Sequence, residues 1–129
     1  MKENKLENFI NAVKRLNEAR TAFGGEPDNT LYRDALIQRF EFTLELAWKT
    51  IREELIEAFF SEKELNSPRN VISKAYQENY IDDEKIWLDM LKERNNIAHI
   101  YSEEDAIAVA DKIKTKFCKV LTKLSKSIK

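Results

Sequence analysis

The chain has 129 residues, a formal net charge of −1, 35% charged and 43% hydrophobic residues, and only two glycines and two prolines. This composition argues against a turn-rich β fold, excludes a global attraction to nucleic acid or membranes, and predicts one helical domain over residues 1–129. The sequence has no apolar run of the ~20 residues that a membrane span needs, no signal-peptide core, and no second cysteine beside Cys118, so we expect a cytoplasmic protein.

The first two predicted helices cover about residues 2–23 and 31–60, and both glycines and one proline lie between them. The second is the longest, and it is apolar on more than one side. The residues off its main apolar stripe are Leu36, Phe42, Leu46, Ile56 and Phe60. Because shorter helices can cover only part of this surface, we expect a homodimer or a larger homo-oligomer. The alternative is complete cover within one chain.

Two shorter helices are predicted in the middle of the chain. Ser67 and Pro68 have the character of an N-cap and first helical residue, for a helix that ends near position 80. Asp82 is the predicted N-cap of the next helix, which ends near Ala98.

The final predicted helix covers about residues 103–127 and begins after Ser102, with Asp105 as its capping-box partner. From Lys112 onward it has seven lysines and no acidic residue. This lysine stripe indicates either a solvated face or a surface that contacts a phosphate backbone. Cys118 lies just off the apolar stripe and is more typical of a packing residue than of a nucleophile.

A polar cluster from Arg94 to Tyr101 covers the tail of the helix that ends near Ala98 and the turn before Ser102, and it contains the only histidine, His99. An arginine can hold a phosphate through its planar fork, and a histidine can move protons near neutral pH. The alternative is a histidine that only caps carbonyls at the end of a helix. One histidine and one cysteine cannot form a zinc site in a single chain, and there is no glycine-rich phosphate loop. We therefore expect no metal and no cofactor.

The spacing of Arg94, His99 and Tyr101 matches the Arg-x4-His-x-Tyr signature of HEPN domains. The chain resembles their HepT-like family, also described as nucleotidyltransferase substrate-binding proteins, over about residues 5–125. Three further stretches match in order: residues 33–50, 67–69 and 87–91. The chain departs from the family at Ala98, where relatives often carry a hydroxyl residue.

The resemblance implies an all-α fold, an antiparallel up-and-down four-helix bundle with one extra short helix, which dimerises. It also implies a separately encoded minimal nucleotidyltransferase as a partner. Two functions follow from it: a metal-independent ribonuclease toxin that the partner neutralises, or a non-catalytic substrate-binding subunit of a two-component nucleotidyltransferase. The residues that it assigns are Arg94 and His99 as catalytic and Tyr101 as the residue modified by the partner. We expect Asn95, Asn96 and Glu41 to support this site.

The chemistry of RNA cleavage favours a site shared by two chains. Attack by a 2′-hydroxyl needs a base for the nucleophile and an acid for the leaving oxygen. Two chains would supply two copies of His99 for these roles, and two copies of Arg94 to stabilise the charged phosphorane. We therefore expect a ribonuclease acting on RNA, with the substrate-binding subunit second and a plain helical interaction module third.

Overall fold

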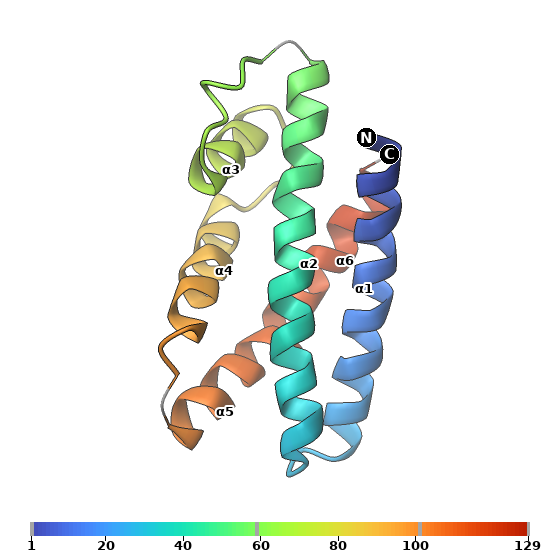
Figure 1. The fold of residues 1–129 in the computed structure, drawn as a ribbon, viewed down its shortest axis with the longest axis vertical. Helices are drawn as coiled ribbons and strands as arrows, with labels where there is room; N and C mark the ends of the chain where they lie inside the picture. Colours follow the sequence, from blue (N-terminus) through green and yellow to red (C-terminus); the bar gives the residue numbers. More distant parts are fainter. Residues whose placement is uncertain (1, 59, 101, 129) are drawn as a thin grey trace.

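Figure 1 shows a computed structural model of the protein, which describes residues 2–58, 60–100 and 102–128. Phe59 and Tyr101 lie outside these residues. Phe59 belongs to the main apolar stripe predicted for the second helix, and Tyr101 belongs to the predicted site. The described residues form helices without strands, and the predicted all-α fold is confirmed. The helices are α1 (Lys2–Gly25), α2 (Thr30–Glu57), α3 (Pro68–Gln77), α4 (Glu84–Ile97), α5 (Glu103–Lys112), the π-helical turn η1 (Ile113–Phe117) and α6 (Cys118–Ser127).

The long helices form an antiparallel bundle with α3 as the extra short helix (Figure 1). Helices α1 and α2 lie side by side and make the most extensive contact in the molecule. The run from α5 through η1 to α6 is one continuous helical rod, which contacts both of them. Helix α4 descends beside α2 and leads into α5 (Figure 1).

Local capping explains where most of these helices begin. Ser67 caps α3, accepting a hydrogen bond from the Asn70 amide at 3.1 Å, and Pro68 follows as predicted. The N-cap of α4 is Asp83 rather than the predicted Asp82, because the Asp83 carboxylate accepts the Ile86 amide at 3.2 Å. Both aspartates have the character of an N-cap, but helical geometry begins one residue later than the sequence indicated.

The third helix is shorter than predicted, since it ends at Gln77 rather than near Tyr80. Asn79 has a φ of 65°, in the left-handed region that commonly ends helices and that asparagine tolerates. The chain therefore leaves helical geometry three residues early.

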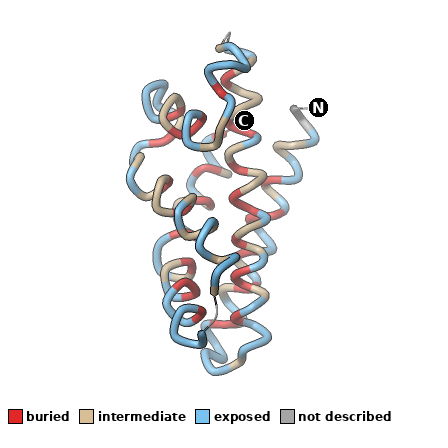
Figure 2. Tube along the Cα trace, turned by 60° about the vertical axis from the view of Figure 1, so that its left-hand side comes forward, coloured by how far each residue is buried: buried red, intermediate tan, exposed pale blue. Residues whose placement is uncertain are grey.

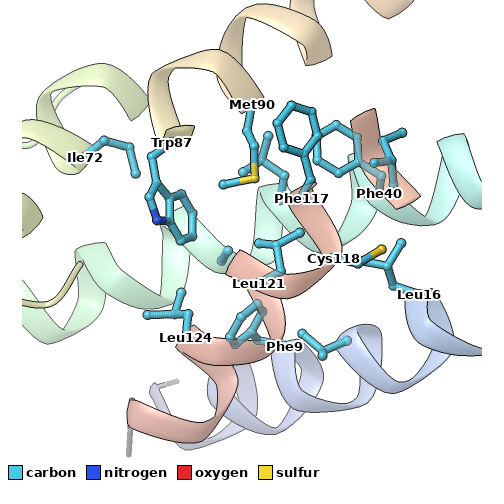
Figure 3. Close-up of a cluster of buried hydrophobic side chains, with 14 of the residues drawn as sticks. Phe9, Leu16, Phe40, Ile72, Trp87, Met90, Phe117, Cys118, Leu121 and Leu124 are labelled. Carbon is cyan, nitrogen blue, oxygen red and sulfur yellow. The ribbon is translucent and has the colours of Figure 1, made fainter. Parts of the chain in front are cut away.

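The core gathers around the last helical run, which lies between α1 and α4 (Figure 3). The rings of Phe40 and Phe117 are stacked with their centroids 5.2 Å apart, and both are completely buried. Cys118 is buried beside Leu16, and burial raises the pKa of its thiol to about 11. It is a packing residue, in agreement with its position just off the apolar stripe.

Exposure differs among the apolar residues that lie off the main stripe of α2. Leu36 is completely buried, and Leu46 and Ile56 are half-buried. Phe42, however, is 62% exposed. Buried and exposed segments alternate along the long helices, as expected for helices with one face in the core (Figure 2). One chain therefore leaves an apolar side chain of α2 uncovered.

The last helix contains a turn that the sequence did not predict. Between α5 and α6 the backbone widens into a π-helical turn, in which the Cys118 amide donates to the Ile113 carbonyl. Such turns break the normal i to i−4 pattern and recur at functional sites. In the part of the chain that the structure describes, no helix is both long and apolar enough to cross a membrane.

Candidate functional site

The polar cluster of the sequence lies at the junction between α4 and α5. Helix α4 closes with a tight turn, in which the His99 amide donates to the Asn96 carbonyl at 2.8 Å. Ser102 then caps α5 as predicted, its hydroxyl oxygen accepting the Asp105 amide at 3.2 Å. The side chain of His99 is exposed at this junction.

One side of the junction is hollowed by a pocket of about 330 Å³ between α4 and α5. Its polar lining consists of Glu93, Asn96, His99, Asp105 and Lys112. The Lys112 ammonium lies 2.7 Å from a Glu93 carboxylate oxygen, and this hydrogen bond raises the pKa of Lys112. The pair ties α5 to α4 and holds the two walls of the pocket together.

Arg94 projects toward α2 instead. Its Nη2 donates to Glu45 Oε1 at 2.8 Å, and both side chains are partly exposed. Among the described residues, Arg94 is not part of the lining of the pocket that His99 and Asn96 share. A single chain therefore presents the arginine and the histidine on different sides of the end of α4.

Glu41 was the acidic residue that the sequence indicated, and Glu45 is the one that pairs with Arg94. Glu41 lies one turn earlier on α2 and lines a second hollow of about 480 Å³, together with Ile97 and Ile100. Asn95 is exposed on α4. The sequence signal for Glu45 was its i, i+4 relation to both Glu41 and Lys49, which does not by itself identify a partner.

Sequence reasoning also missed Arg33, which lies at the start of α2 and is only 8% exposed. Its Nη1 and Nη2 atoms lie 2.7 and 3.2 Å from the two carboxylate oxygens of Glu103, the first residue of α5. This two-pronged pair raises the pKa of Arg33 and lowers that of Glu103. It fixes the start of α5 against α2, directly after the junction that carries His99.

Replacing Arg33 by Met should loosen the junction without unfolding the bundle, because methionine keeps the buried stem and removes the ion pairs with Glu103 and with the neighbouring Asp34. Glu103 is largely exposed, so solvent screens the pair and its contribution to stability is small. We expect amide hydrogen exchange at His99 and Ile100 to quicken by up to about fivefold. Arg39→Met, on the same helix but remote from α5, is the matched control. Equal exchange in all three proteins would show that Arg33 does not hold the junction.

The structure thus brings Asn96 and His99 into one pocket and directs Arg94 to α2, while Tyr101 lies outside the described residues. Among residues 2–58, 60–100 and 102–128 there is no group of three or more His, Cys, Asp or Glu that could hold a metal ion. What the structure defines is an all-helical bundle with Asn96 and His99 in a pocket at the junction between α4 and α5.

Comparison with known families agrees with this class. The sequence profile of nucleotidyltransferase substrate binding protein like domains matches residues 4–129. The chain belongs to this family, and the resemblance inferred from its sequence is confirmed. A search of curated proteins finds no match.

Proposed function

We propose that the protein is the HepT-like component of a two-gene nucleotidyltransferase system, and that it cleaves RNA without a metal at a site formed by Arg94 and His99 of two chains. The observation that carries the proposal is the Arg-x4-His-x-Tyr spacing at the end of α4, with His99 exposed at the edge of a pocket. Family membership supports the pairing with a nucleotidyltransferase.

In the proposed reaction, one His99 accepts the proton of the RNA 2′-hydroxyl, whose oxygen attacks the adjacent phosphorus. The bond from phosphorus to the 5′-oxygen breaks, and the second His99 gives that oxygen a proton. The products are a 2′,3′-cyclic phosphate and a free 5′-hydroxyl. Arg94 stabilises the extra negative charge on the phosphorane, and Glu45 holds the guanidinium in place through Nη2.

We infer two copies because one His99 cannot conveniently act as both base and acid in a single turnover. In one chain, moreover, Arg94 contacts Glu45 while His99 lines the pocket between α4 and α5. The surface beside Arg94 suits a second copy. Phe42 is 62% exposed on α2, and Glu45, which holds Arg94, lies three residues further along the helix. Residues three apart are neighbours on one helix face, so a contact through Phe42 would place the Arg94 of each chain beside the interface, with His99 five residues further along the same chain.

Phe42→Glu should therefore dissociate the dimer. Burying an unpaired carboxylate at an interface costs several kcal/mol, which corresponds to a dissociation constant raised at least about 100-fold. Sedimentation at micromolar concentration should move from about twice the chain mass to the 15.2 kDa of one chain. Tyr76→Glu, at an exposed aromatic residue on α3, is the matched control and should leave the mass unchanged. Wild type sedimenting as one chain would refute the dimer.

The second candidate is a non-catalytic substrate-binding subunit. It agrees with the family description, nucleotidyltransferase substrate binding protein like, and with a pocket of about 330 Å³ whose lining carries both acidic and basic groups. In that case the pure protein would cleave no RNA, and changes at Arg94 or His99 would impair nucleotidyl transfer by the separately encoded partner.

Digestion of RNA by the pure protein in the presence of a chelator separates the two candidates. The ribonuclease predicts cleavage with a 2′,3′-cyclic phosphate end that persists in chelator. The binding subunit predicts intact RNA in every reaction, and nucleotidyl transfer only when the partner is added. Cleavage that disappears in chelator would contradict the metal-free mechanism.

Co-expression with the partner should add nucleotide-sized mass to the chain at Tyr101. This tyrosine lies between His99 and Ser102 in the sequence, so an added phosphate would place negative charge beside the residues that bind substrate phosphate. Intact-mass spectrometry of wild type and Tyr101→Phe checks the site, with Tyr80→Phe as the control tyrosine. If the additions persist in Tyr101→Phe, the modified residue lies elsewhere.

A further inference from the structure

A groove of about 420 Å³ lies between α1 and α6, away from the junction of α4 and α5. Four of its lining residues are cationic: Arg20, Lys119, Lys123 and Lys126. Among the described residues, no carboxylate belongs to this lining. The groove is therefore strongly positive in a protein whose formal net charge is −1.

The π-helical turn fixes one of these cations. Arg20 Nε donates to the Lys114 carbonyl inside the turn at 2.8 Å. The Nη atoms of Arg20 make no other hydrogen bond among the described residues, so they remain available to a ligand. An arginine held in this way has its remaining donors already oriented for a ligand. A stripe of lysines that only faces solvent would not need such an arginine.

A hydrogen bond also joins the two helices across the groove. Asn17 Nδ2 donates to Thr122 Oγ1 at 3.0 Å, which joins α1 to α6 across the groove. Lys119 and Lys126 are exposed, and Lys123 forms an exposed ion pair with Asp82. A lining of polar donors and exposed cations suits a repeating anion better than an apolar ligand.

We propose that this groove binds the phosphate backbone of RNA and guides the strand to the Arg94/His99 site, an inference that rests on the proposed function. Lys112 lines the pocket beside His99, and Lys119 lines the groove. The two lysines are seven residues apart in one helical run, about 10 Å at 1.5 Å per residue. A few nucleotides therefore reach from the pocket to the groove. The competing occupant is an acidic protein surface.

The test is binding of a fluorescent single-stranded RNA, followed by anisotropy between 50 and 200 mM salt, with His99→Ala throughout so that no strand is cut. Lys119→Gln/Lys126→Gln removes two groove cations at exposed positions. Lys63→Gln/Lys85→Gln removes two exposed lysines elsewhere and is matched in charge. Each phosphate contact contributes about 0.7 to the slope of log K against log salt for single strands.

The groove variant should lower this slope by about 1.4 and weaken binding at 50 mM salt by roughly 10–100-fold, and the control should stay close to the parent. Equal slopes in all three proteins would overturn the proposal. So would a groove variant that keeps the RNA slope but no longer binds the partner protein. If RNA binding depends on the groove lysines but wild type cleaves no RNA, the groove proposal is supported and only the ribonuclease function is refuted.

Discussion

His99→Ala is expected to lower RNA cleavage by about 10²–10⁴-fold, the usual contribution of general acid–base catalysis. Both proton transfers of the proposed reaction pass through copies of this imidazole, so its loss removes the acid and the base together. The side chain is exposed, and the variant should stay folded, which circular dichroism checks. Single-turnover cleavage of labelled RNA in chelator measures the effect.

Arg94→Lys should also be impaired in this assay, because an ammonium cannot reproduce the planar fork of a guanidinium. Lys92→Ala, at an exposed position on the same helix, is the matched control and should cleave as wild type does. Equal cleavage by wild type and His99→Ala contradicts the catalytic role of the histidine. If none of the proteins cleaves while the dimer is intact, the substrate-binding subunit becomes the better account.

Phe117→Ala should lower the free energy of unfolding by about 3–5 kcal/mol, as is usual when a buried phenylalanine is truncated. Phe117 is completely buried, ends the π-helical turn, and stacks on Phe40. The cavity would open where α2 meets the last helical run, and neither can move without breaking other core contacts. Urea denaturation followed by circular dichroism measures the loss.

Tyr76→Ala is the control for this substitution, because Tyr76 is 45% exposed, and it should change the free energy of unfolding by well under 1 kcal/mol. If the free energy of unfolding of Phe117→Ala lies within 1 kcal/mol of the wild-type value, the core does not depend on the stacked pair.

Local signals allowed the helices to be predicted from sequence. Ser67 and Ser102 cap the helices that follow them because a capping oxygen reaches only the next turn. The sequence could not show which of Asp82 and Asp83 is the N-cap of α4, since both carry a suitable carboxylate. The π-helical turn could not be predicted, because the Lys114 carbonyl that it contains is bonded by Arg20, 94 positions away in the sequence.

In the candidate site, too, the features set by local sequence could be predicted and those set by contacts between helices could not. The spacing of Arg94 and His99 is local, so the sequence alone placed both at the end of one helix. The partners of the site come from other helices: Glu45 binds Arg94 from α2, and Arg33 holds α5 through Glu103. Choosing Glu45 over Glu41 requires the rotation of α2 against α4, which depends on packing of the whole bundle.

The central claim, a catalytic site completed by two chains, is tested most directly by measuring specific activity on dilution through the dissociation constant of the dimer. Sedimentation with a labelled chain gives the dimer fraction at each concentration, and cleavage of a trace RNA substrate is followed in the same samples. The account predicts that specific activity falls in proportion to the dimer fraction. Specific activity that stays constant as the protein becomes monomeric would contradict it.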